Sequence, residues 1–86
     1  MANINVCFIW KGEKIVISSN ENVILAELVN QYNNKTKIKL NNKFKLIYNE
    51  CEIAPNSCKF LKELKLSNNS IIFVEGEEED IEYGNL

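Results

Sequence analysis

The chain of 86 residues contains no histidine, no arginine and only one proline. Histidine is the commonest general acid–base group and the commonest metal ligand, so its absence removes the usual basis of catalytic and metal sites. Arginine makes the bidentate contacts that suit phosphates and base edges, so nucleic acid is a poor candidate partner. No apolar run approaches the roughly 18 residues of a membrane-spanning helix, and the N-terminus lacks a basic-then-apolar leader. We therefore expect neither a membrane span nor a secretory signal.

The three cysteines, Cys7, Cys51 and Cys58, form no close pair in the sequence. The spacing between Cys51 and Cys58 matches no common zinc motif, and no histidine is present to complete a tetrahedral site. We expect three reduced thiols, no metal and no cofactor. The reduced thiols indicate an intracellular reducing compartment, cytoplasm or nucleus in the first place, with an organelle left open. Because none of the thiols has a recognisable base partner, we also expect no enzymatic activity.

Charge is divided unevenly along the chain. Residues 1–74 hold all ten lysines and six acidic residues, a net charge of +4, whereas residues 75–86 hold six acidic residues and no lysine, a net charge of −6. We expect a folded domain over residues 1–75 followed by an acidic C-terminal tail over residues 76–86. The tail is too highly charged to bury much surface, and the sequence predicts that it is mobile.

Half of the lysines fall in one short stretch, the basic patch, which consists of Lys35, Lys37, Lys39, Lys43 and Lys45. One interpretation is a solvated basic loop and strand edge. The other is a docking patch, either for an acidic protein surface or for the acidic tail of this chain. The sequence alone leaves both interpretations open.

The first forty residues contain a hairpin pattern and then a helical pattern. Residues 4–10 are β-branched and aromatic, residues 11–14 include a glycine, and residues 14–18 return to strand character. After a cluster of polar residues the period changes, because apolar side chains recur at helical spacing from Leu25 to Tyr32, with Leu28 and Val29 between them. Asn20 or Asn22 is the expected N-cap, and Asn33–Asn34 the expected end.

The remainder of the chain predicts three further strands and a short helical turn. The strands are expected at residues 44–48, 51–53 and 70–74, and the turn near residues 61–66. A single helix can cover only one face of the resulting sheet, so the opposite face is left to solvent or to a partner.

This order of elements resembles the ubiquitin-like β-grasp family over about residues 3–75. Residues 45–49, Lys-Leu-Ile-Tyr-Asn, are similar to the family's Arg-Leu-Ile-Phe-Ala-Gly strand. Residues 61–74 resemble the family's Leu-x-x-Tyr-x-Ile … Ser-Thr-Leu-x-Leu ending. The resemblance implies an α+β fold in which one helix packs across one face of a mixed four- to five-stranded sheet.

The chain departs from the conjugated members of that family in its glycines. Ubiquitin and its small modifier relatives end in adjacent glycines, whereas Gly12, Gly76 and Gly84 are all isolated here. We therefore expect a non-conjugated ubiquitin-like protein that acts as a protein–protein interaction module or as a small structural subunit of a larger complex. The alternative is a modifier that is conjugated after atypical C-terminal processing at Gly84.

The resemblance also implies an apolar patch on the sheet face opposite the helix. The alternation of residues predicts that Leu46 points into the core, whereas Ile47, Ile71 and Phe73 point outward. The predicted partner-binding residues on this face are Cys7, Ile9, Val16, Ile47 and Phe73. The other interpretation is that a few exposed apolar side chains are ordinary for a small domain.

Overall fold

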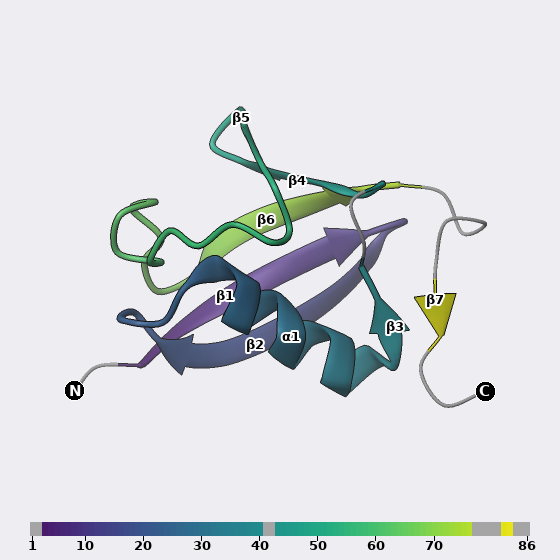
Figure 1. Ribbon diagram of the computed structural model, residues 1–86, viewed down its shortest axis with the longest axis horizontal. Helices are drawn as coiled ribbons and strands as arrows, with labels where there is room; N and C mark the ends of the chain where they lie inside the picture. Colours follow the sequence, from purple (N-terminus) through teal and green to yellow (C-terminus); the bar gives the residue numbers. More distant parts are fainter. Residues whose placement is uncertain (1–2, 41–42, 77–81, 84–86) are drawn as a thin grey trace.

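The computed structural model describes residues 3–40, 43–76 and 82–83 (Figure 1). The elements in chain order are β1 (Asn3–Trp10), β2 (Glu13–Asn20), α1 (Leu25–Thr36), β3 (Ile38–Lys39), β4 (Lys45–Tyr48), β5 (Cys51–Ile53), β6 (Ser70–Glu75) and β7 (Glu82–Tyr83). Five strands form one sheet in the order β2-β1-β6-β4-β5, and β3 pairs with β7 in a second, two-stranded sheet. The α+β architecture with a mixed five-stranded sheet and one helix in the described residues confirms the predicted fold.

The centre of the main sheet is a parallel pair between the first and last of its strands. β1 lies parallel to β6, with Phe8 opposite Ile72, and antiparallel to β2. β4 lies antiparallel to both β6 and β5, with Leu46 opposite Val74. Alternate residues of β6 are buried, as are Ile4, Val6 and Phe8 of β1, as the period of two predicted.

Both two-residue hairpin connections use left-handed backbone conformations. Lys11 and Gly12 join β1 to β2 with φ angles of 51° and 80°, and Asn49 and Glu50 join β4 to β5 with φ angles of 52° and 68°. Positive φ at both central positions is the feature of type I′ turns, whose twist matches that of the flanking strands. Tight turns therefore join the strands at residues 11–12, within the expected connection of residues 11–14, and at residues 49–50, between the two strands expected there.

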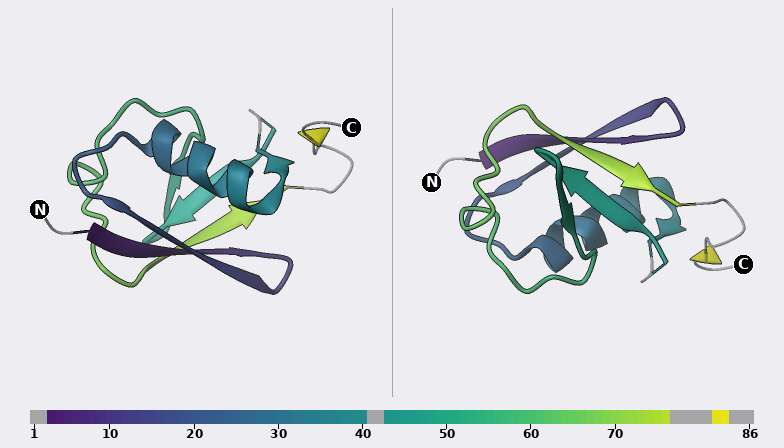
Figure 2. Two further views of the ribbon diagram at one scale, coloured as in Figure 1. Left: turned by 90° about the horizontal axis from the view of Figure 1, so that it is seen from below. Right: turned by 90° about the horizontal axis from the view of Figure 1, so that it is seen from above.

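The helix α1 runs across one face of the sheet, in front of the strands in one view of Figure 2 and behind them in the other. Its buried residues are the four that the helical spacing predicted, Leu25, Leu28, Val29 and Tyr32. The rings of Tyr32 and Phe8 lie 4.8 Å apart between their centroids, which joins the helix to the centre of the sheet. Burial, with a smaller effect of the Glu13 carboxylate, raises the pKa of Tyr32. No helix of the described ranges is long and apolar enough to cross a membrane.

The prediction of an asparagine N-cap is wrong. The Asn20 side-chain oxygen accepts a hydrogen bond from the backbone N–H of Asn22 instead, and the N-cap residue is Ile24, whose side chain makes no capping bond. The first N–H groups of the helix, those of Leu25 and Ala26, donate to the backbone carbonyls of Lys59 and Ser57 at 2.9 and 3.0 Å. A distant loop therefore satisfies the orphan donors that a side chain satisfies in most helices.

The helix also ends later than the Asn33–Asn34 prediction, which is wrong because the last helical residue is Thr36. Lys37 is the C-cap in a left-handed conformation, with φ of 63°, and its N–H donates to the Asn33 carbonyl at 2.8 Å. The Asn33 side-chain oxygen accepts a bond from the Leu40 N–H at 3.1 Å, so Asn33 fixes the chain after the helix rather than ending it.

The expectation of a mobile tail is wrong at two residues. Glu82 and Tyr83 form β7, which lies antiparallel to β3 beyond the end of α1 (Figure 1). Backbone pairing does not require apolar side chains, so a highly charged segment can still add a strand to an exposed edge. The other tail residues that this expectation covered, 77–81 and 84–86, lie outside the described residues.

The last residue of the main folded segment, Gly76, lies against two aromatic side chains. The indole N–H of Trp10 donates to the Gly76 carbonyl at 3.1 Å. The Trp10 and Phe44 rings contact edge to face, with 5.9 Å between their centroids. A Cβ atom on Gly76 would overlap the Phe44 ring, so this position requires the absence of a side chain.

Replacing Gly76→Ala is expected to lower the free energy of unfolding by about 1–3 kcal/mol, because the added methyl group overpacks a buried ring. Chemical denaturation of the full chain measures the loss. The same substitution in a Phe44→Leu background, where the ring is gone, should cost clearly less. An equal loss in the two backgrounds would show that the close contact with Phe44 is not the cause.

Candidate functional site

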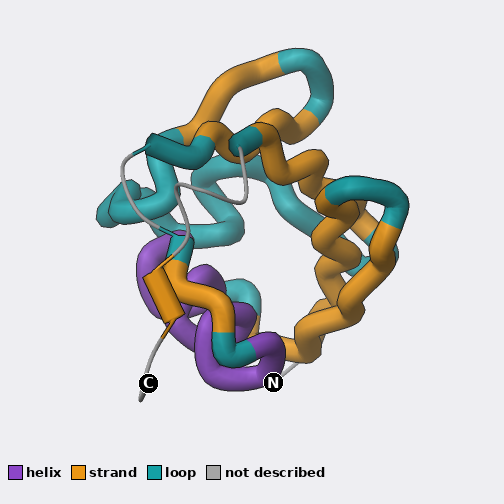
Figure 3. The backbone as a smooth tube through the Cα atoms, turned by 90° about the vertical axis from the view of Figure 1, so that its right-hand side faces the viewer, coloured by secondary structure: helices purple, strands orange, loops and turns teal. Residues whose placement is uncertain are grey.

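The sheet face opposite α1 carries two neighbouring rows of apolar side chains. Strand register aligns Ile9, Phe73 and Ile47 across three adjacent strands, with Lys14 at one end of this row and Glu52 at the other. The next row consists of Val16, Cys7 and Ile71 on β2, β1 and β6. Figure 3 shows this sheet and the helix on different sides of the molecule.

Five of these side chains reach solvent, and we call them the outer-face patch: Ile9, Val16, Ile47, Ile71 and Phe73. Phe73 is 51% exposed, Ile71 44% and Val16 42%. Ile9 and Ile47 are half-buried. Exposed large apolar side chains are ordinary when single, but adjacent ones on one face are typical of a contact surface.

The prediction that Cys7 is an exposed member of this surface is wrong, because the residue is only 6% exposed. Cys7 lies on a central strand, directly between Val16 on β2 and Ile71 on β6. The larger neighbours cover its small side chain and leave a shallow hollow of about 290 Å³ whose lining includes all three residues. Cys7 is therefore part of the support of the patch and not of its contact surface.

Ile71 belongs to the patch although the predicted binding residues did not include it. The alternation that places Phe73 outward also places Ile71 outward, and the structure confirms both orientations. The signal was thus present in the sequence. Its position directly beside Cys7 became clear only from the parallel register of β1 and β6.

Charged residues border the apolar rows. Lys45 lies opposite Glu75 in the register of β4 and β6. The Lys45 ammonium and a Glu52 carboxylate oxygen are 3.8 Å apart, with both side chains about 60% exposed. An exposed pair of this kind adds little stability, but a charged rim around an apolar centre is the usual organisation of a protein interface.

The five lysines of the predicted basic patch are spread over the last turn of α1, its C-cap, β3, the loop before β4 and β4 itself. Lys45 lies on β4 beside Glu52, whereas Lys35, Lys37 and Lys39 follow one another through the end of α1 into β3. The Lys35 ammonium donates to the Val16 carbonyl at 2.9 Å, and Lys43 is an exposed residue of the loop before β4. We call the three lysines from the end of the helix into β3 the basic segment.

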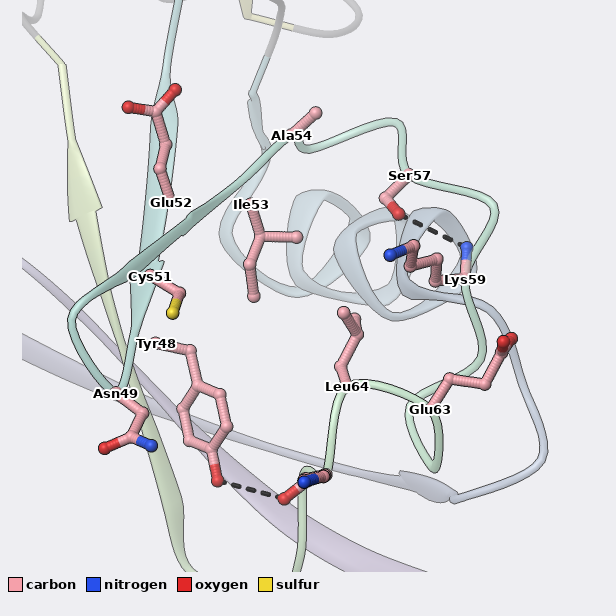
Figure 4. Close-up of a pocket in the computed structure, with 11 residues that line it drawn as sticks. Tyr48, Asn49, Cys51, Glu52, Ile53, Ala54, Ser57, Lys59, Glu63 and Leu64 are labelled. Atoms are coloured by element: carbon pink, nitrogen blue, oxygen red, sulfur yellow. Dashed lines mark hydrogen bonds between the residues drawn. The ribbon is translucent and has the colours of Figure 1, made fainter.

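A cavity of about 570 Å³ lies between β5 and the loop that follows it (Figure 4). Ile53, Leu64 and Tyr48 contribute apolar surface, and the Cys51 side chain also lines this space. The Tyr48 hydroxyl is held by the Lys65 carbonyl at 3.1 Å and by Ser70 Oγ at 3.2 Å. Within the described part of the chain no three His, Cys, Asp or Glu side chains gather as a metal site would require.

The three thiols are unpaired but differ in accessibility, since Cys51 and Cys58 are exposed and Cys7 is buried. Reaction of the folded chain with a thiol reagent should therefore label two cysteines quickly and one much more slowly. Mass spectrometry of the digested protein identifies the slow site. Rapid labelling of Cys7 would show that Val16 and Ile71 do not cover it, and unfolding in denaturant should make all three rates similar.

Comparison with solved structures identifies the fold as ubiquitin-like. The ubiquitin-like domain of yeast Ddi1 aligns with a TM-score of 0.74 and 22% identity over 87% of this chain and 90% of that one. Ubiquitin of Caldiarchaeum subterraneum aligns with a TM-score of 0.68 and 10% identity, over 90% and 99% of the two chains. ATBAG1, solved in complex with HSP70, aligns with a TM-score of 0.71 and 19% identity over 87% of this chain, which spans 41% of that longer chain.

No model of a protein family matches the sequence, and no curated protein matches it. The alignments with solved structures show that the chain has the ubiquitin-like β-grasp fold. These likenesses are all below 25% identity, so they establish the architecture, whereas function has to be argued from the site.

Proposed function

We propose that this domain is a docking module, a non-conjugated ubiquitin-like protein that binds a protein partner through the outer-face patch. The observation that carries the proposal is the exposure of Phe73 and Ile71, two residues apart on β6, beside Val16 and Ile47 on the open face of the sheet. Burying such apolar area against a partner contributes a favourable binding free energy of roughly 25 cal/mol per Å². Docked in this way, the module acts on its own or as a small subunit of a larger complex.

The spacing of the patch suits a partner with a short apolar stripe. Successive outward residues of a strand, such as Ile71 and Phe73, are about 6.6 Å apart, and neighbouring strands are about 4.8 Å apart. Residues four apart on a helix rise by about 6 Å, so an amphipathic helix can place two apolar side chains beside these two. The rim residues Lys14 and Glu52 lie at opposite ends of the central row and favour a partner with charges of both signs.

The solved neighbours support a docking role. Several are ubiquitin-like domains, and one, ATBAG1, was solved in complex with another protein, HSP70. We propose no catalytic role, in keeping with a sequence that has no histidine. We also propose an intracellular reducing compartment, which suits the unpaired and exposed thiols of Cys51 and Cys58.

A charged residue introduced in place of Phe73 should abolish docking without unfolding the domain. Phe73→Asp places a carboxylate on an exposed face and should change the free energy of unfolding by less than about 1 kcal/mol, whereas Leu46→Asp buries a charge and should cost roughly 4 kcal/mol or more. Phe60→Asp is the matched control, because Phe60 is 48% exposed and lies beside Ile24, away from the patch. Denaturant unfolding and capture of partners by the tagged chain are measured for each variant.

The expected result is loss of the captured protein with Phe73→Asp and its retention with Phe60→Asp. Equal loss with both variants would contradict docking at the outer-face patch. Equal destabilisation by Phe73→Asp and Leu46→Asp would contradict the orientation of β6 and β4.

Conjugation at Gly84, which lies outside the described residues, is the second candidate, and a denaturing experiment separates it from docking. Partners that dock are expected to disappear when the cell extract is denatured before purification, because no covalent bond holds them. Immunoblots should therefore show only the free chain. Higher-mass adducts that persist in denaturant and vanish with Gly84→Ala would replace the docking proposal by conjugation.

A further inference from the structure

One edge of the short strand β3 is already paired with a second strand, β7. β3 and β7 form a two-stranded sheet apart from the main one, with Ile38 opposite Tyr83 and Lys39 opposite Glu82 (Figure 1). An aromatic residue opposite a β-branched one and an acidic residue opposite a lysine are both favourable cross-strand pairs. The register thus matches residue types as well as backbones.

The two segments that meet here carry opposite charge. Residues 75–86 have six acidic residues and no basic one, whereas Lys35, Lys37 and Lys39 follow one another through the end of α1 into β3. The C-terminal end of a helix adds negative partial charge, which lysines in the last turn offset, so the basic segment is favoured there in its own right. The pairing of β3 with β7 thus joins a basic stretch of the sequence to an acidic one.

A pair of two-residue strands is too short to be stable alone. The chain segment that connects β7 to the folded domain must therefore favour the pairing. Gly76 fixes the start of the tail, because its carbonyl accepts the Trp10 indole N–H and its Cα lies against Phe44. Five residues of the sequence, 77–81, then separate Gly76 from Glu82. A tether of this length gives an effective concentration on the order of mM, sufficient to populate a weak pairing.

From these observations we infer that the β3 edge is a docking site for an extended acidic peptide, which adds as an antiparallel strand, and that the tail of this chain occupies it in cis. The site is distinct from the outer-face patch, which uses apolar side chains of the main sheet. An acidic segment of another protein has to displace β7 in order to bind. The tail is therefore a built-in competitor for this second surface.

The first test breaks the pairing within the full chain. Tyr83→Pro removes a backbone N–H in β7 and restricts φ, so the strand can no longer pair. The amide NMR signals of Ile38 and Lys39 are expected to shift in this variant and to stay unchanged in Asn85→Pro, which lies beyond the paired residues. Unchanged β1 and β6 signals show that the fold is intact. Identical β3 signals in the native and Tyr83→Pro chains would overturn the inference.

The second test supplies the tail in trans as a synthetic peptide of residues 77–86. The peptide should restore the native Ile38 and Lys39 signals of the Tyr83→Pro chain, and it should act at least about tenfold more weakly on the native chain, where the tethered tail competes. Raising the salt concentration from about 0.01 M to about 1 M shortens the Debye length from about 30 Å to about 3 Å and should weaken this binding.

Charge reversal identifies the lysines involved. In the Tyr83→Pro background, Lys37→Glu with Lys39→Glu should abolish peptide binding. Lys59→Glu with Lys62→Glu changes the net charge equally at exposed positions of another loop and should preserve it. Equal peptide binding by native and Tyr83→Pro chains, or equal loss with both lysine pairs, would overturn the inference. None of these outcomes depends on docking at the outer-face patch.

Discussion

The parallel pairing of β1 with β6 decides which side chains at the centre of the sheet face the helix and which face outward. It joins residues near the two ends of the folded segment, with Phe8 opposite Ile72 and Ile9 opposite Phe73. The first of these pairs is buried beneath the helix, and the second faces outward. A slip of one residue would exchange the two faces, exposing the core and burying the patch. The strong preference for burying Phe8 and Ile72 therefore also orients the proposed docking surface.

The two candidate surfaces rest on different physical forces. The outer-face patch is apolar at its centre, so salt should affect its contacts only at the charged rim. The β3 edge offers backbone hydrogen-bonding groups and neighbouring lysines, so its affinity for an acidic strand depends on ionic strength. A chain with both surfaces can hold one partner by apolar burial while β7 still pairs with the edge of β3.

Local patterns predicted the strands, the buried face of the helix and the outward direction of Ile47 and Phe73, because those features depend on residue spacing alone. The patterns did not predict the burial of Cys7, which results from the neighbours that β2 and β6 place beside it. The helix start was missed because backbone carbonyls of a distant loop have no side-chain signature. The β3–β7 pair was missed for the same reason, since a two-residue strand leaves no periodic pattern.

The carbonyl groups that accept the first N–H groups of α1 lie more than thirty residues further along the chain. The same loop also donates hydrogen bonds to the segment just before the helix, because the N–H groups of Leu61 and Lys62 bond the carbonyls of Val23 and Glu21. A twelve-residue helix is only marginally stable in isolation. Its first turn therefore becomes fully bonded only after a long loop has closed, which couples the folding rate of the domain to the loop that precedes β6.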